Sequence, residues 1–381
     1  MANTLTNLIP DAYVALDVVS RELTGLIPSV TRDATADRVA KGQNVRSFVT
    51  PANSAAGDIT PSMASSSSAP IANQTIDNVA ITIEKERFAP FSWNAEEEYA
   101  MDQGPGFLNI RQDQIAQAIR TLVNEIETDL YNDIVTSVSR ATGTSGTSPF
   151  ASNLADSAEA RRALDDNGAP MGNRSLVLNT AAGAKLRTLT TLVNVSDAGS
   201  SMTLRDGELL NIHGLSVKES AKVVDVTSGD GSGYKINNGS GYAVGATTLA
   251  VDTGSGTILA GDIITIGNFK YGVKTALGGG NVVIQEPGLQ EAVADNADVT
   301  VNATSPRNIA LSQNAVVLAT RLPATPSDGD LAIGREVVTD PRTGLSLEFV
   351  KWPGFDMNVY HVRASWGVHV LKPEHIAAIL G

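Results

Sequence analysis

Residues 109–140 read NIRQDQIAQAIRTLVNEIETDLYNDIVTSVSR, and this stretch predicts the element around which the rest of the chain is organised. Its apolar residues recur every three or four positions, as on one face of an α-helix: Ile115, Ile119, Leu122, Ile126, Leu130, Ile134 and Val138. At about 1.5 Å per residue such a helix is roughly 45 Å long, far longer than the average helix of about a dozen residues. We therefore expect a structural strut with one buried face rather than the wall of a pocket.

The composition limits the fold and the partners. The 381 residues are 42% hydrophobic, carry a formal net charge of −13 and include no cysteine. That is enough apolar content and length for two or three folded domains. The negative charge disfavours sequence-specific DNA binding but not enclosing DNA, and the lack of cysteine excludes disulfides and thiolate zinc sites. With no signal-peptide pattern and no apolar run of about 20 residues, we expect a soluble protein made in a cytoplasm.

Two stretches before the long helix suggest segments that project from the folded domains. Residues 13–23 form a short amphipathic pattern, which fits either an N-terminal core helix or an arm that docks on a neighbouring chain. Strand patterns at 45–51 and 78–85 flank about 25 small and polar residues. A loop of that length is uncommon inside a compact domain, so the pattern favours a long projecting hairpin over a linker between two domains.

The second half alternates between mixed and all-β patterns. Residues 150–220 predict a helix from Ser157, a strand at 175–179 and a helix that begins at Thr180 as a candidate cap. Between Asp225 and Thr300 lie 15 of the 34 glycines among short β segments, which indicates an inserted β domain; its expected strands are 241–244, 248–251, 263–266, 270–273 and 281–284. Residues 313–320 are compatible with a helix, and 345–352 and 357–371 predict strands, the first pairing with an earlier strand across the turn 340–344.

No pattern of residues predicts a catalytic or metal site. His361 and His369 share one face of an expected strand but would lie about 26 Å apart, which is too far for one metal ion. Gly278–Gly280 lacks the Lys-Ser/Thr of a phosphate loop and fits a hairpin, and Asp230–Gly233 lacks the regular oxygen ligands of a calcium loop. We therefore expect a protein that is not an enzyme and that holds no cofactor or metal.

The order of these parts resembles the Hong Kong 97-type fold of tailed-phage major capsid proteins. Four stretches also resemble coat proteins of the Salmonella short-tailed phage type with a β insertion domain: LAGDIITIGNFKYGVK at 259–274, NVVIQE at 281–286, RNIALSQNAVVLATR at 307–321 and SLVLNTAAG at 175–183. The implied fold class is α+β, with these parts: N-terminal arm 1–45; E-loop hairpin 46–85; peripheral domain with the spine helix 86–148; axial domain 149–222 and 305–350; inserted β-barrel domain 223–304; and C-terminal strands 351–381 that return to the peripheral domain.

The resemblance also implies a function and partners. The chain would self-assemble into hexamers and pentamers of an icosahedral shell on a scaffolding protein, with a portal protein, in the host bacterial cytoplasm. The mature virion capsid would enclose double-stranded DNA without sequence-specific binding, and whether a decoration protein binds stays open. Because no lysine lies between Lys41 and Lys85, an isopeptide crosslink from a loop lysine is excluded.

Five residues are candidates for subunit or scaffold contacts. Asp11 and Asp17 would receive a basic segment of the scaffolding protein, and Asp58 lies in the loop that would cross the neighbouring subunit. Asp230 and Lys235 would form salt bridges between capsomers. One rival is an encapsulin-like bacterial nanocompartment, whose usual pattern lacks the β insertion. A surface-layer or adhesin protein is another, and it would need an export signal and tandem repeats.

Overall fold

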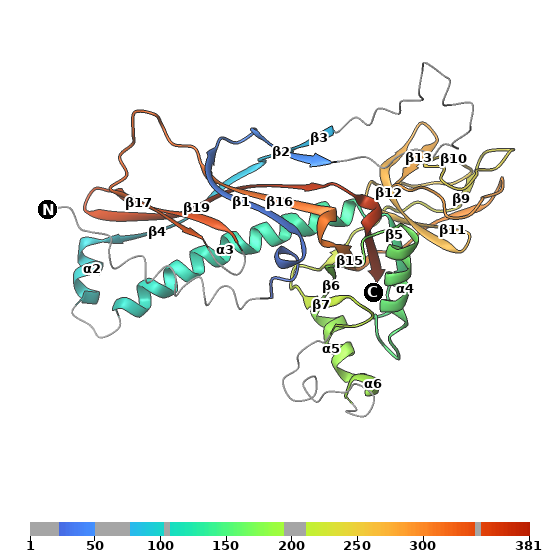
Figure 1. Cartoon of the computed structure of the whole chain (residues 1–381), viewed down its shortest axis with the longest axis horizontal. Helices are drawn as coiled ribbons and strands as arrows, with labels where there is room; N and C mark the ends of the chain where they lie inside the picture. The colour runs from blue at the N-terminus through green and yellow to red at the C-terminus, as the bar shows by residue number, and fades with distance from the viewer. Residues whose placement is uncertain (1–22, 50–76, 103–106, 194–210, 340–343) are drawn as a thin grey trace, which may run out of the picture.

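The long helix α3 (Phe107–Thr136) is the axis of the structure, a computed structural model that describes residues 23–49, 77–102, 107–193, 211–339 and 344–381. Few helices and many strands surround it, which agrees with the expected mixture of helix and strand (Figure 1). The other α-helices in the described ranges are α2 (Ala95–Asp102), α4 (Ala155–Asp166), α5 (Thr180–Thr188) and α6 (Thr190–Val193). Among the described residues, no helix is long and apolar enough to cross a membrane.

The apolar stripe of α3 is buried as the sequence predicts. Every stripe residue from Ile115 to Val138 is at most 3% exposed. The expected end of the helix at Arg140 is wrong, because α3 ends at Thr136 and β5 (Arg140–Gly143) follows. The Ser139 amide donates to the carbonyl oxygen of Ile376 instead of to a helical carbonyl. Pairing with the C-terminal strand therefore ends the helix.

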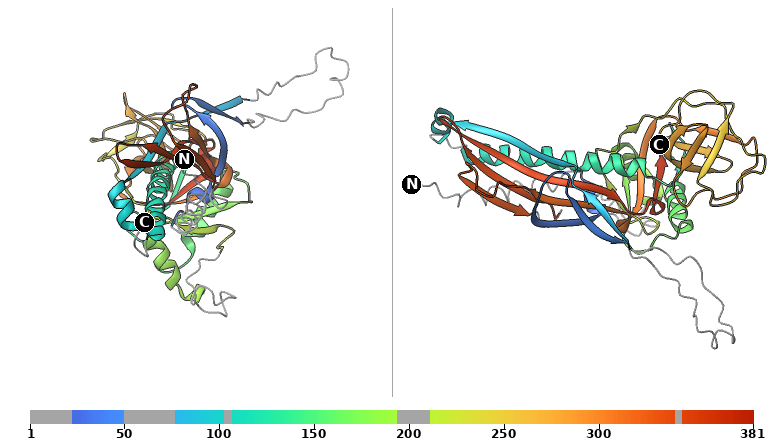
Figure 2. Two further views of the ribbon diagram at one scale, coloured as in Figure 1. Left: turned by 90° about the vertical axis from the view of Figure 1, so that its left-hand side faces the viewer. Right: turned by 90° about the horizontal axis from the view of Figure 1, so that it is seen from above.

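The stripe packs on a six-stranded sheet that runs along the helix (Figure 2). Its longest strand, β19, pairs with β4 along one side and with β16 and β18 along the other. Trp366 of β19 is buried and donates from Nε1 to Asp129 on α3 at 2.8 Å. The strands are β1 (Thr31–Val39), β4 (Lys85–Asn94), β16 (Val316–Pro323), β17 (Gly334–Thr339), β18 (Ser346–Pro353) and β19 (Met357–Val370).

The helix expected at residues 313–320 is wrong. Only Gln313–Ala315 form a 3-10 turn, and β16 then begins at Val316. All eight residues of β16 are buried, because the strand lies between β1 and β19. The position inside a sheet decides here over a local sequence that suits either state.

The two strands of the expected hairpin are present. They are β2 (Asn44–Val49) and β3 (Asp77–Thr82), which pair with each other antiparallel from Asn44↔Thr82 to Val49↔Asp77. They form a two-stranded sheet of their own that points away from the body (Figure 2). Only its base is packed, through Ile81 and Ile83 against Val317 and Ala319 of β16.

A second sheet joins the mixed unit to the β unit. Its strands are β5, β6 (Arg174–Leu178), β7 (Ser216–Glu219), β8 (Asp225–Val226), β9 (Tyr234–Ile236), β10 (Thr248–Asp252), β11 (Ile263–Ile266), β12 (Phe269–Gly278), β13 (Asn281–Ile284), β14 (Asp298–Val301), β15 (Ser305–Ser312) and β20 (Ile376–Leu380). The helices α4 and α5 cover β6, β15 and β20 around one core. The cap of α5 is Asn179 and not Thr180, since the Asn179 side chain accepts from the Ala182 amide at 2.7 Å.

Strands β9–β14 surround a separate core, which includes Ile236, Ile264, Tyr271 and Val282. The expected strand at 241–244 is only an isolated bridge, Tyr242↔Val293. The glycine run does join two strands, and Gly279 and Gly280 have φ angles of 59° and 79°, as a tight two-residue turn requires. The predicted domain boundaries remain predictions.

Candidate functional site

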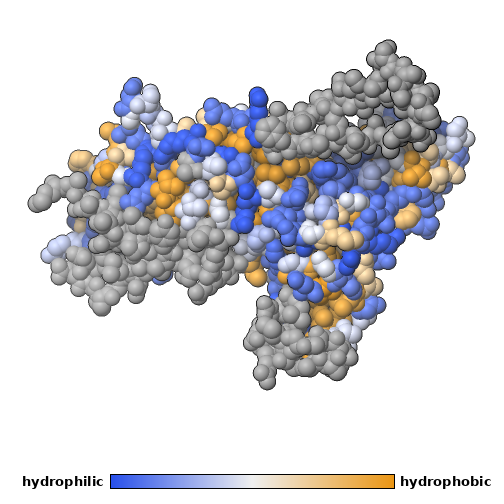
Figure 3. Space-filling model, viewed as in Figure 1, coloured by the Kyte–Doolittle hydropathy of each residue, from blue (hydrophilic) through white to orange (hydrophobic). Residues whose placement is uncertain are grey.

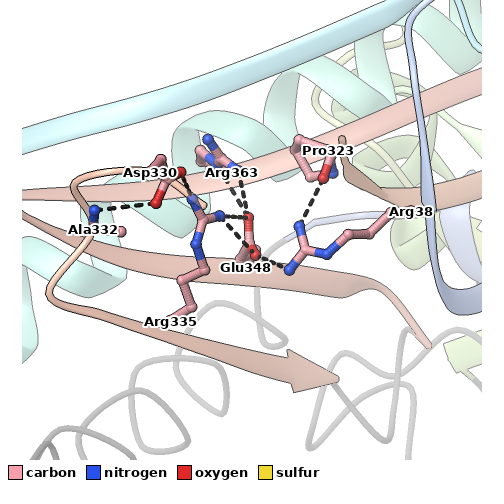
Figure 4. Close-up of polar contacts among 7 residues, drawn as sticks. All are labelled: Arg38, Pro323, Asp330, Ala332, Arg335, Glu348 and Arg363. Atoms are coloured by element: carbon pink, nitrogen blue, oxygen red, sulfur yellow. Dashed lines mark hydrogen bonds and ion pairs between the residues drawn. The ribbon is translucent and has the colours of Figure 1, made fainter. Parts of the chain in front are cut away.

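Several buried charged residues connect separate elements of the fold. Glu348 on β18 is fully buried and accepts from three arginines, Arg38, Arg335 and Arg363 (Figure 4). The distances are 2.5 Å from Arg38 Nη2, 2.6 Å from Arg363 Nη2 and 3.3 Å from Arg335 Nη1. Arg335 also pairs with Asp330. We call this group the Glu348 cluster; it joins β1, β17, β18 and β19.

The charges of the Glu348 cluster stabilise its carboxylate. Burial raises the pKa of Glu348, but the hydrogen bonds and charges of Arg38 and Arg363 outweigh this, so the pKa lies below its ordinary value. Arg38 also donates from Nη1 to the carbonyl oxygen of Pro323, at the end of β16. Because Arg38 lies at the end of β1, six positions before β2 begins at Asn44, the cluster fixes the root of the hairpin.

A second buried carboxylate ties the first described residues to the long helix. Glu127 is fully buried on α3 and accepts from the Leu26 amide at 2.8 Å, the Ile27 amide at 3.0 Å and Ser220 Oγ at 2.8 Å. Burial raises the pKa of Glu127, although these hydrogen bonds act against it. Nearby, Lys218 donates to the carbonyl oxygen of Pro28 at 3.0 Å. The chain that precedes β1 is therefore held by polar contacts inside the body.

A third group joins the long helix to the β unit. Tyr131 on α3 donates from its hydroxyl to the carbonyl oxygen of Val224 at 2.8 Å, and burial raises its pKa to about 12. Arg307 on β15 is buried and donates to the carbonyl oxygen of Gly261, in the turn before β11. Burial lowers the pKa of Arg307, with Asp262 acting in the opposite direction. These contacts fix the β unit at the end of α3.

Large apolar side chains are exposed at the far end of the six-stranded sheet. Phe355, in the turn between β18 and β19, is 98% exposed, and Leu331 before β17 is 80% exposed. Tyr99 on α2 is 72% exposed, and the Ala95 amide of this helix bonds to the carbonyl oxygen of Asp356 in the same turn. We call Tyr99, Leu331 and Phe355 the distal apolar residues. Figure 3 shows apolar surface in separate patches rather than as one continuous face.

A groove lies between the edge strand β4 and α3. It has a volume of about 510 Å³ and is lined by Phe88, Ala89, Pro90 and Phe91 of β4 and by residues 113–121 of α3. Phe88 is 56% exposed and stacks on His361, with ring centroids 4.6 Å apart. Pro90 has no amide hydrogen, which limits pairing of another strand to this edge.

The structure describes two of the five predicted contact residues. Asp230 accepts from the Thr257 amide and hydroxyl, both at 2.7 Å, and Lys235 pairs with Asp298 at 2.7 Å. Both residues thus have partners within their own chain and do not pair with each other. Asp11, Asp17 and Asp58 lie outside the described residues.

Three of the four histidines, His361, His369 and His375, are buried or half-buried, whereas His213 is exposed. His361 lies among Phe88 and Trp352, and His369 pairs through its backbone with Val317 of β16. Burial lowers the pKa of His361, His369 and His375 below its ordinary value. Among the described residues, no group of three or more acidic or histidine side chains is arranged to hold a metal ion.

The sequence reasoning missed the buried charges. Glu127 lies four residues after Val123 and three before Leu130, on the buried face of the helix, and Glu348 lies between the apolar residues Leu347 and Phe349. A carboxylate in such a position must be paired inside the protein or change its protonation. This signal is present in the sequence, but it does not identify the partners.

No family model and no curated protein matches the chain. Several solved structures are similar to it. The capsid of the cyanophage P-SCSP1u has 14% identity and a TM-score of 0.48, covering 92% of this chain and 86% of its own. A structure from Mycobacterium phage Che8 has 12% identity and a TM-score of 0.47, with 89% and 85% covered. The virus-like particle of Pyrococcus furiosus has 11% identity and a TM-score of 0.44, with 98% and 99% covered. At these values the likeness does not assign the chain to a family.

Proposed function

We propose that this chain is the subunit of a self-assembling protein shell, and specifically a major capsid protein of the tailed-phage type that encloses double-stranded DNA. The observation that carries the proposal is the hairpin β2–β3, which pairs with no other described strand. A two-stranded ribbon is marginally stable alone in water. The surface of a second copy would cover it and complete its packing.

The rest of the molecule supports the same reading. Tyr99 lies on α2, which Figure 1 shows at the end of the six-stranded sheet away from strands β9–β13. The distal apolar residues therefore offer exposed apolar surface in addition to the hairpin. The Glu348 cluster holds the root of the hairpin and Glu127 holds Leu26 on α3, which favours interfaces of defined geometry. The sequence resemblance of residues 175–183, 259–274, 281–286 and 307–321 to coat proteins adds the specific family.

The finer parts of the proposal follow from that family. Shell assembly would use a scaffolding protein and a portal protein in the host cytoplasm, and the product would be the virion capsid. Asp11 and Asp17 would contact a basic scaffold segment, Asp58 would lie against the neighbouring subunit, and Asp230 and Lys235 would lie at contacts between capsomers. Charge reversal at Asp17 should then reduce scaffold incorporation, and unchanged incorporation would contradict this contact.

Electron microscopy and sedimentation of the full-length protein test the proposal directly. We expect closed shells that contain nuclease-protected DNA when the protein is isolated from its natural source. Small shells that contain an enzyme cargo and no DNA would favour the nanocompartment instead, although the β unit at residues 223–304 is not typical of that class. A protein that stays monomeric at high concentration, even when it is co-expressed with the proteins of neighbouring genes, would contradict both the capsid and the nanocompartment.

A further inference from the structure

Arg140, the first residue of β5, is buried without hydrogen-bond partners for its guanidinium. Its side chain is 3% exposed, and both Nε and Nη1 are shielded from solvent and unsatisfied. One neighbour is the ring of Tyr271, whose centroid lies 4.9 Å from the guanidinium carbon. A buried charged donor that lacks an acceptor is unfavourable, so this arrangement calls for an acceptor that the described residues do not supply.

Arg140 is also one of the residues that line a small cavity between three elements. The cavity has a volume of about 180 Å³ and lies between β5, the helix α4 and the start of β12. Lys270 on β12, Arg162 on α4, Asn268 and Gln290 line it as well. Lys270 has no ion-pair partner within the described ranges of the chain. The space is several times the roughly 30 Å³ that one water molecule occupies in the liquid.

The acidic groups of the cavity do not satisfy Arg140. Glu159 pairs with Arg162 Nη2 at 2.8 Å, and Asp166 lies 4.0 Å from Arg162 Nη1. With Arg140, Arg162 and Lys270 against Glu159 and Asp166, the lining carries three positive and two negative charges, a net charge of +1. Burial lowers the pKa of Arg140 even though Tyr271 and Asp166 act in the opposite direction.

We propose that this cavity binds a small oxyanion such as phosphate, with Arg140 as the buried donor and Lys270 as the second cation. An oxyanion supplies several acceptor oxygens with a negative charge, which matches two cations without acceptors better than neutral water does. The site does not depend on the proposed shell function.

Calorimetric titration of the full-length protein with inorganic phosphate, at constant ionic strength set with chloride, tests the proposal. We expect saturable binding and a melting temperature that rises with phosphate concentration. Arg140→Met should abolish both. Lys270→Gln should weaken binding about tenfold, since it removes one charge-assisted hydrogen bond.

Two further variants make the test specific. Lys274→Gln changes the net charge equally on the same strand but lies outside the cavity, so it should bind phosphate like the original protein. Asp166→Asn removes a competing negative charge and should tighten binding. The proposal is overturned if the original protein shows no saturable binding, or if Lys270→Gln and Lys274→Gln weaken binding equally. This pair also decides the outcome if Arg140→Met does not fold.

Discussion

Arg38 and Glu348 lie 310 positions apart in the chain, and their side chains meet with 2.5 Å between Nη2 and Oε1. Glu348 is fully buried, whereas the Arg38 side chain is 34% exposed. The pair therefore connects a buried carboxylate in the middle of the sheet to a strand end at the surface, beside the root of the hairpin.

Glu348→Gln should lower the free energy of unfolding by about 3 kcal/mol, because it leaves three arginines around a neutral group in a buried position. Chemical denaturation of the full chain measures this. The pKa of Glu348 is lowered on folding, so its contribution is present at neutral pH and is lost as the pH falls below its ordinary value of 4.5.

Glu336→Gln on the neighbouring strand β17 is the matched control for this substitution. Glu336 has no ion-pair partner within the described ranges, so this change should alter stability by less than about 0.5 kcal/mol. Equal effects of the two substitutions would show that the cluster does not stabilise the fold.

The sequence predicts the elements that have a local pattern, but it does not predict these charged contacts. The stripe from Ile115 to Val138 was predictable because its period is local and every member faces one core. The strand β16 was not, since its state depends on β1 and β19, which lie far away in the sequence. Likewise, Glu348 and Arg140 are ordinary charged residues until distant strands bury them. Local patterns predict elements, and only the assembled sheet identifies the buried charges.

Asp133→Asn should stabilise the protein at neutral pH. Asp133 lies on α3, and burial, with help from Glu84 and Asp129, raises its pKa to about 6 from 3.8. A raised pKa means that the folded protein is favoured by protonation, and that this advantage is lost as the pH rises through about 6. Removing the charge should then add about 1–2 kcal/mol at pH 7, allowing for solvent screening, and almost nothing below pH 4.

Asp129→Asn gives the opposite expectation on the same helix. Asp129 accepts from Lys85 Nζ at 2.7 Å and from Trp366 Nε1 at 2.8 Å, so losing its charge should destabilise the fold. Unfolding curves of both variants at pH 4 and pH 7 compare the two. If Asp133→Asn is less stable than the original protein at pH 7, burial of the Asp133 carboxylate does not destabilise the folded state.

Gly367→Ala should loosen the hairpin from the body. A Cβ atom on Gly367 of β19 would lie 2.0 Å from the carbonyl oxygen of Thr82 at the end of β3, so the backbone must shift. Such overpacking costs about 1–3 kcal/mol. Hydrogen exchange should therefore become faster at the amides of β2 and β3. Gly239→Ala, where a Cβ atom meets nothing within 4 Å, should leave these amides unchanged.

Phe355→Ser should separate folding from assembly. Phe355 is 98% exposed, so its replacement should change the free energy of unfolding by less than about 0.5 kcal/mol. If the distal apolar residues join copies of the chain, the same change should raise the protein concentration needed for shells to form, as sedimentation would measure.

Serine at the half-buried Phe269 of β12 is a poor control, because this residue packs against the core of the β unit. Val244→Ser, at another exposed apolar residue of the β unit, is the better comparison. Shells that form from Phe355→Ser at the original concentration would remove the distal apolar residues from the proposed interfaces, while leaving the hairpin as the surface through which copies meet.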